Sequence, residues 1–260
     1  MNKIEEVFAA QKKVFIPFVT AGDPSLSKTE ELIYAMEEAG AGIIELGIPF
    51  SDPVAEGPVI QAADTRALEA GTTTDKLFAM LERVRTKTQI PLVFLTYVNP
   101  IFIYGCDKFF ARCQELGIDG VIVPDVPYEE KAEILPYCRK YDVDLISMIA
   151  PTSADRIKMI AQEAMGYIYI VSSLGVTGVR KEITTDIGAM VQQIRAVTTV
   201  PCAVGFGIST PEQAKRMATL SDGAIVGSAI VKLIATHGSE CVPIVKQYVE
   251  EMVAAVNSIK

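Results

Sequence analysis

The stretch GIIELGIPFSDPVAEGP, from Gly42 to Pro58, places one charged residue inside an apolar run. Continuously apolar runs are typical of parallel strands that helices cover on both faces, so this run is predicted to be such a strand. Side chains alternate along a strand, which puts Ile44 and Leu46 on one face and Glu45 on the other. The function of Glu45 therefore depends on which side of the complete sheet it faces.

The same kind of unit recurs along the whole chain. A short apolar run is followed by a loop rich in Gly, Pro or Asp, and then by a helical pattern with apolar residues three and four positions apart. Ser25 and Thr210 are predicted N-caps of two of these helices, because their hydroxyls can accept a hydrogen bond from the first turn. The runs predicted to be strands are 14–22, 42–48, 91–99, 119–125, 144–150, 167–173, 201–207 and 223–230.

Eight strands that alternate with helices predict an α/β fold, a (β/α)8 TIM barrel that forms a single domain over residues 1–260. We also expect an extra N-terminal helix and an extra helix between strands two and three, where the gap is long. A doubly wound open sheet is the alternative, which the lack of a G-x-G-x-x-G motif after the first run disfavours. In a barrel Glu45 points inward near the C-terminal end of its strand, where barrel enzymes hold their catalytic groups.

The composition excludes several classes of protein. A formal net charge of −8 argues against nucleic acid or an anionic membrane as the main partner. The five cysteines are odd in number and include no C-x-x-C pair, which indicates free thiols and a cytoplasmic protein. The N-terminus does not read as a signal peptide, and no apolar run is long enough to span a bilayer. His237 is the only histidine and reads as a surface residue, so we predict neither a metal nor a cofactor.

Two carboxylates stand where chemistry is expected. Loss of water inside the barrel should raise the pKa of Glu45 into a range useful for acid and base catalysis. The alternative is a buried ion pair, but none of the strand runs contains Lys or Arg. Glu56 follows in a loop over the same barrel mouth, and three prolines stiffen this loop. The alternative to a catalytic role for Glu56 is an ordinary solvated carboxylate. Schiff-base chemistry is disfavoured, because no strand run offers a lysine.

Three glycine loops, GVTG (175–178), GFG (205–207) and GSA (227–229), follow the last three strand runs. Glycine lets backbone N–H groups approach a ligand closely, and loops after strands seven and eight of barrels commonly bind phosphate. The alternative to phosphate binding is that these glycines only allow the turns of their loops. The strand ends also carry aromatic residues that indicate a flat apolar substrate, unless they only pack the core: Phe18, Tyr97, Tyr169 and Phe206.

Six segments together resemble the tryptophan synthase alpha subunit family, in family order and across nearly the whole chain. The second is highly distinctive, whereas the last two are shared with other phosphate-binding barrels. The segments are PFVTAGDP (17–24), ELGIPFSDPVAEGPVIQ (45–61), VPDVPYEE (123–130), GVTGVR (175–180), GFGIS (205–209) and VGSAIVK (226–232).

The resemblance implies a lyase of tryptophan biosynthesis, which cleaves indole-3-glycerol phosphate to indole and glyceraldehyde 3-phosphate by a retro-aldol reaction. It also implies a partner, a pyridoxal-phosphate beta subunit, in an alpha2-beta2 heterotetramer. Loops 49–57 and 174–186 are expected to close over the substrate and exclude water. On the first of these loops, Pro49 and Asp52 are candidate partner contacts or loop-coupling residues.

The resemblance further implies roles for single residues. Glu45 is the catalytic acid and base, and Glu56 is the catalytic carboxylate that binds the indole nitrogen. Thr177 helps to close the site. The implied phosphate contacts are Gly178, Gly207, Gly227 and Ser228. The implied indole pocket is Phe18, Ile60, Leu95, Tyr97, Ile122, Ile149, Tyr169 and Phe206.

One residue departs from the family pattern, because Glu56 stands where the family usually has Asp. The extra methylene moves the carboxylate by about one C–C bond, and a misplacement of about 1 Å can cost on the order of 100-fold in rate. Either the surrounding loop compensates for the extra length, or indole is bound less tightly.

Two other functions fit the residues. One is another phosphate-binding barrel enzyme, such as a sugar-phosphate isomerase or epimerase, which an assay of indole release distinguishes. The other is a barrel that only regulates or supports a partner, which a single-turnover assay distinguishes and the intact carboxylate pair disfavours.

Overall fold

The computed structural model describes residues 2–172, 186–205 and 207–259. Within these ranges one nine-stranded sheet forms, in the order β5-β4-β3-β2-β1-β9-β8-β7-β6, and its neighbouring strands are parallel. The strands are β1 Val14–Thr20, β2 Ile44–Gly47, β3 Leu92–Leu95, β4 Gly120–Ile122, β5 Asp144–Leu145, β6 Ser147–Ile149, β7 Ile168–Val171, β8 Cys202–Gly205 and β9 Gly223–Val226. Each lies within one of the predicted runs.

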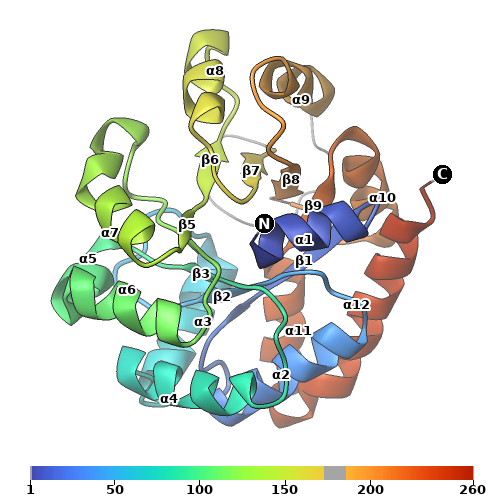
Figure 1. Ribbon diagram of the computed structural model, residues 1–260. Helices are drawn as coiled ribbons and strands as arrows, with labels where there is room; N and C mark the ends of the chain where they lie inside the picture. Colours follow the sequence, from blue (N-terminus) through green and yellow to red (C-terminus); the bar gives the residue numbers. More distant parts are fainter. Residues whose placement is uncertain (1, 173–185, 206, 260) are drawn as a thin grey trace.

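The sheet closes on itself through the run predicted over 144–150. Ile146 divides this run into β5, which pairs with β4, and β6, which pairs with β7. The backbone N–H of Ile146 still donates to the carbonyl of Val121, at 2.9 Å. The two edge strands are therefore one continuous segment, and the eight predicted strands form a ring with helices around it (Figure 1). The (β/α)8 barrel is confirmed, and the open sheet is excluded.

The helices follow the predicted pattern. An extra helix, α1, precedes the first strand, and both α3 and α4 lie between β2 and β3, as expected. The helices are α1 Lys3–Ala10, α2 Leu26–Glu38, α3 Pro58–Glu69, α4 Thr74–Arg85, α5 Val98–Tyr104, α6 Cys106–Glu115, α7 Leu135–Lys140, α8 Ala154–Gln162, α9 Ile187–Arg195, α10 Pro211–Leu220, α11 Ser228–His237 and α12 Cys241–Asn257, with 3-10 turns η1 Tyr128–Glu133 and η2 Gly238–Glu240. Ser25 and Thr210 accept from the backbone N–H groups of Lys28 and Gln213, which confirms both N-caps.

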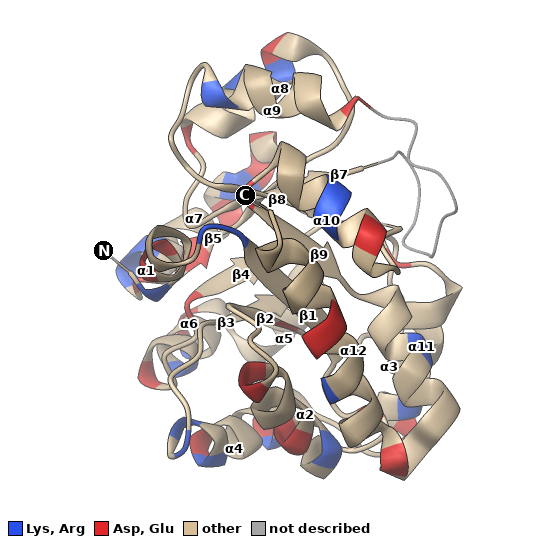
Figure 2. Ribbon diagram, turned by 90° about the vertical axis from the view of Figure 1, so that its right-hand side faces the viewer, with Lys and Arg blue, Asp and Glu red and all other residues tan. Residues whose placement is uncertain are grey.

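Alternation along the strands sorts the apolar side chains into two layers. Ile44 and Leu46 pack in the cluster between strands and helices, whereas Ile43 packs in the cluster inside the ring. Fully burying one such side chain contributes about 1.5–3 kcal/mol, so both layers stabilise the barrel. Among the strand residues, only Glu45 and Asp144 are Asp, Glu, Lys, Arg or His. Figure 2 shows the other charged residues on helices and loops.

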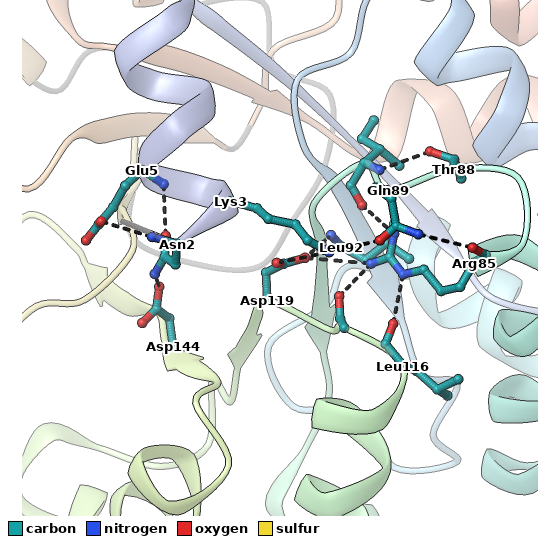
Figure 3. Close-up of polar contacts among 12 residues, drawn as sticks. Asn2, Lys3, Glu5, Arg85, Thr88, Gln89, Leu92, Leu116, Asp119 and Asp144 are labelled. Atoms are coloured by element: carbon teal, nitrogen blue, oxygen red, sulfur yellow. Dashed lines mark hydrogen bonds and ion pairs between the residues drawn. The ribbon is translucent and has the colours of Figure 1, made fainter.

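Helix α1 closes the N-terminal end of the ring, across which it lies in Figure 1. Asn2 and Glu5 form its capping box, and the Asn2 amide also donates to the Asp144 carboxylate at 2.5 Å (Figure 3). Beside it, the Arg85 guanidinium donates to the carbonyls of Ile90, Leu116 and Gly117. These polar contacts therefore fix α1 and the neighbouring loops at this end of the ring.

No helix within the described ranges is long and apolar enough to cross a membrane.

Candidate active site

A cavity lies at the C-terminal end of the strands, with about 50 Å³ open to the centres of water-sized molecules. Small-molecule sites are lined mostly by apolar groups with a few polar ones. The lining residues are Phe18, Glu45, Ala55, Glu56, Ile60, Leu95, Pro124, Met148, Tyr169, Gly207, Ile208, Ile225, Gly227 and Ser228. Both predicted carboxylates therefore meet in one largely apolar space.

Glu45 lies inside the ring, beside Phe18 of the neighbouring strand in the β1–β2 register. A side chain at Gly47 would come within 2.7 Å of the Phe18 ring, so glycine there makes room for this ring. The Glu45 side chain is 1% exposed, and its Oε1 accepts from the Tyr167 hydroxyl at 2.6 Å. Burial raises the pKa of Glu45 to about 8, against the opposing effect of the Tyr167 hydrogen bond. Glu45 is therefore a protonated acid at neutral pH.

Glu56 lies at the end of loop 49–57, just before α3, and its residue is 5% exposed. Its backbone carbonyl accepts from the Gln61 side chain at 2.8 Å. Its Oε2 has no hydrogen-bond partner among the described residues, and burial raises the pKa of Glu56 to about 7. No described cation affects Glu45, which disfavours the alternative of a buried ion pair there. Glu56 is buried, so the alternative of a solvated carboxylate is wrong.

The far end of the cavity is the N-terminus of α11. Gly227 is the N-cap and makes no side-chain cap hydrogen bond, and Ser228 is the first helical residue. The first N–H groups of a helix have no acceptor within the helix and attract anions. Gly207, which has a φ of +78°, lines the same cavity. Three of the four predicted phosphate contacts therefore lie together, and Gly178 lies outside the described residues.

The predicted indole pocket is only partly assembled around this cavity. Phe18, Ile60, Leu95 and Tyr169 line it. Ile122 is fully buried inside the ring but is not a lining residue. Phe206 and Thr177 lie outside the described residues, as do residues 174–185 of the second predicted loop.

Two further residues of the predicted pocket lie elsewhere. Ile149 packs between the strands and the helices, and its neighbour Met148 lines the cavity instead. The reason is alternation, since β5 and β6 keep one register and turn the even-numbered residues inward. Tyr97 is buried, but it contacts the underside of loop 49–57 through Ala55 rather than the cavity. The assignment of Ile149 to the pocket is therefore corrected.

Tyr167 is the functional residue that sequence reasoning misses. It is fully buried inside the ring, with its hydroxyl on Glu45 and its ring 6.1 Å from that of Phe8 on α1. An alternating YIYIV pattern places both Tyr167 and Tyr169 inward, and this signal was available. What the pattern does not give is the hydrogen bond, because that depends on two strands that are 122 residues apart.

A third buried acid, Asp64, lies on α3 one turn after Ile60. Its side chain is 6% exposed and pairs with no described residue. Burial, together with the charges of Glu56 and Asp23, raises the pKa of Asp64 to about 8. Asp23 itself is held by two hydrogen bonds from Arg66, at 2.9 and 2.7 Å. Its surroundings therefore favour the neutral form of Asp64.

Asp64→Asn is expected to stabilise the protein, increasingly as the pH rises. The ordinary pKa of an Asp carboxyl is 3.8, and that of Asp64 in the folded protein is about 8. Between these values the folded state holds a proton that the unfolded state has lost, so the parent loses stability with rising pH. The neutral variant avoids this loss, by on the order of 2 kcal/mol at pH 7. Urea unfolding of parent and variant at pH 5 and pH 8 measures this difference in the free energy of unfolding.

The control for this prediction is Asp155→Asn, at an exposed position of α8, which should change stability by less than about 0.5 kcal/mol. An equal gain for Asp64→Asn at both pH values would contradict the assigned titration.

No cluster of three or more His, Cys, Asp or Glu residues able to hold a metal ion occurs among the described residues.

Comparison with known proteins places this site in a family. A family model for the tryptophan synthase alpha chain matches residues 4–258. The tryptophan synthase alpha chain of Lacticaseibacillus casei is 48% identical over 260 residues, which cover 100% of this chain and 97% of that protein. The crystal structure of tryptophan synthase subunit alpha from Legionella pneumophila str. Paris has a TM-score of 0.89 and 36% identity, with 100% of both chains covered.

A second solved structure, of the tryptophan synthase a2b2 complex from the hyperthermophile Pyrococcus furiosus, has a TM-score of 0.85 and 34% identity, and covers 93% of this chain and 98% of that chain. The resemblance drawn from the six sequence segments is confirmed. The chain belongs to the tryptophan synthase alpha chain family.

Proposed function

We propose that this chain cleaves indole-3-glycerol phosphate to indole and glyceraldehyde 3-phosphate, with Glu45 as the acid and base and Glu56 as the acceptor for the indole N–H. The reaction breaks the bond between C3 of the ring and the first side-chain carbon. Its balance needs a proton added at C3 and a proton removed from the adjacent hydroxyl, and no water or oxidant is consumed.

Glu45 supplies both proton transfers. A carboxyl group with a pKa of about 8 carries a proton at neutral pH and can give it to C3. The resulting carboxylate then takes the proton of the side-chain hydroxyl, the C–C bond breaks to form the aldehyde, and its electron pair returns to the ring. The Tyr167 hydroxyl holds the carboxyl in place throughout.

Glu56 favours the ring tautomer that cleaves. Its unpartnered Oε2 can accept the ring N–H, which offsets the positive charge that protonation at C3 places on the ring. This role needs the carboxylate, and a pKa of about 7 makes that form available at neutral pH. Two carboxyl groups with different protonation states thus suffice, and no lysine is required.

The phosphate is bound by main-chain donors. The first N–H groups of α11, after Gly227 and from Ser228 onward, supply them, and no Lys or Arg occurs among the described residues that line the cavity. Gly207 lets its loop approach the same point, and we include Gly178 by family resemblance. The indole lies against Phe18, Leu95 and Tyr169.

The single observation that supports this function best is that Glu45 and Glu56, both buried, line one apolar cavity that ends at an uncapped helix N-terminus. The test is release of indole from indole-3-glycerol phosphate by the purified chain. A sugar-phosphate isomerase or epimerase gives no indole, and a merely regulatory barrel gives none even in a single turnover.

The proposal includes a pyridoxal-phosphate beta subunit as partner, in an alpha2-beta2 complex in the cytoplasm. Exposed apolar residues support a docking surface beside the cavity mouth: Val54 is 72%, Phe102 49% and Ile103 78% exposed. They follow the adjacent strands β2 and β3, and Phe50 and Ile103 line one groove. The candidate partner contacts Pro49 and Asp52 belong to the same loop as Val54. All five cysteines are free thiols, as a reducing cytoplasm requires.

Ile103→Glu is expected to weaken binding to a beta subunit by about tenfold or more, because it places an unpaired charge in an apolar interface. Indole release by the chain alone should stay unchanged. Titration calorimetry with a beta subunit measures the affinity. Leu220→Glu, at a 37%-exposed position on α10, is the matched control and should bind like the parent. Equal weakening by both variants would contradict the assigned surface.

A further inference from the structure

Tyr97 contacts loop 49–57, which carries Glu56, and lies at the start of α5. It lies two residues beyond the end of β3 and is the N-cap residue of α5. Its side chain is 2% exposed. Its hydroxyl oxygen accepts the backbone N–H of Ala55 at 2.9 Å, and its ring centroid lies 5.3 Å from that of Phe50. Both contacts are to loop 49–57, so Tyr97 supports this loop from below.

This support acts next to a proposed catalytic group. Ala55 directly precedes Glu56, and the carbonyl of Glu56 accepts from Gln61 on the other side. The backbone is thus fixed by side chains immediately before and at Glu56, whereas Ser51, Asp52 and Val54 of the same loop are exposed. These two side-chain contacts therefore fix the backbone that carries the Glu56 carboxyl.

The same residue also meets the proposed partner surface. Tyr97 begins α5, which carries the exposed Phe102 and Ile103, and Val54 precedes Ala55 in the loop. We propose that Tyr97 is a positioning residue for Glu56, which it holds through the backbone N–H of Ala55. This inference rests on the proposed function, and it replaces the expected indole contact of Tyr97.

Tyr97→Phe tests this role, because it removes the hydroxyl and keeps the ring against Phe50. Loss of one hydrogen bond that positions a catalytic group is expected to lower kcat for indole release by about five- to tenfold. Binding of indole-3-propyl phosphate, which has no side-chain hydroxyl to react, should change by less than about twofold. Weaker binding of this analogue at unchanged kcat would instead make Tyr97 an indole contact and overturn the proposal.

A double-mutant cycle asks whether Tyr97 acts through Glu56. In a Glu56→Gln background, Tyr97→Phe should lower the rate further by less than about twofold, because the group that it positions is already gone. Losses that multiply in full would overturn the proposal. The matched control is Tyr104→Phe, which also removes one hydroxyl hydrogen bond from α5, to Asp75 at 2.7 Å, and should leave the rate unchanged.

Hydrogen exchange of the Ala55 amide keeps the inference testable without activity. Tyr97→Phe should speed this exchange by about fivefold or more, and Tyr104→Phe should not. An unchanged exchange rate in Tyr97→Phe would show that Tyr97 does not hold the Ala55 amide, and would overturn the proposal. If the parent chain releases no indole, the proposed function fails, and the exchange result still decides whether Tyr97 holds the loop.

Discussion

Glu45→Gln is expected to lower the rate of indole release by about 10³- to 10⁴-fold, because general acid–base catalysis contributes about 10²–10⁴ and this one group serves two proton transfers. Gln has the same shape, and its carbonyl oxygen can still accept from the Tyr167 hydroxyl. The variant can neither give a proton to C3 nor take one from the side-chain hydroxyl. Steady-state release of indole measures the loss.

The binding of indole-3-propyl phosphate should survive Glu45→Gln within about threefold, because the phosphate and ring contacts are elsewhere. Asp144→Asn is the matched control, since Asp144 is the other acid on a strand but lies at the closed end beside Asn2. It should keep the parent rate within about twofold. Substantial turnover by Glu45→Gln would show that a different group moves the protons.

The pH dependence follows from the same two groups. Glu45 must be protonated to start the reaction, so kcat/KM should fall as the pH rises through about 8. Glu56 must be ionised, so kcat/KM should also fall as the pH drops below about 7. The profile should be a narrow bell, and Glu56→Gln should remove its acidic limb. A flat profile from pH 6 to 9 would contradict both assignments.

Alternation and order along the chain suffice to predict the barrel and the direction of Glu45. Each apolar run forms a strand because helices cover both faces, and alternation puts Glu45 on the face opposite Ile44 and Leu46. The same rule turns Ile149 outward and Met148 inward. The family resemblance alone does not give this register.

Contacts between side chains that are far apart in the sequence could not be predicted in the same way. The Tyr167 hydroxyl meets Glu45 across the ring, and Tyr97 meets Ala55 from the next strand. Such contacts depend on side-chain reach and on the height of each residue along the barrel axis. Asp64 was missed for a different reason, because an acid at a helical position one turn beyond Ile60 usually faces water. Only the packing of α3 against β1 and α11 buries it.

Glu56→Ala should lower indole release by about 100-fold or more while the fold persists, because removing one donor or acceptor that stabilises developing charge costs about 10²–10³. Folding is expected to be preserved, since the variant removes a buried carboxyl whose Oε2 has no described partner. Unfolding in urea and indole release, measured on the same sample, separate the two effects. A parent-like rate would make Glu56 a bystander of the loop.

Glu56→Asp then asks whether the chain is built for the longer side chain. It keeps the charge but withdraws the carboxylate by about 1.5 Å, while Tyr97 and Gln61 still hold the backbone of the loop in place. We expect a rate between those of the parent and Glu56→Ala, with the acidic limb of the pH profile retained. A rate above that of the parent would mean that the loop is set for the shorter residue and that Glu56 reaches the indole nitrogen only with strain. A loss as deep as that of Glu56→Ala would mean instead that position, and not charge alone, makes the carboxylate effective.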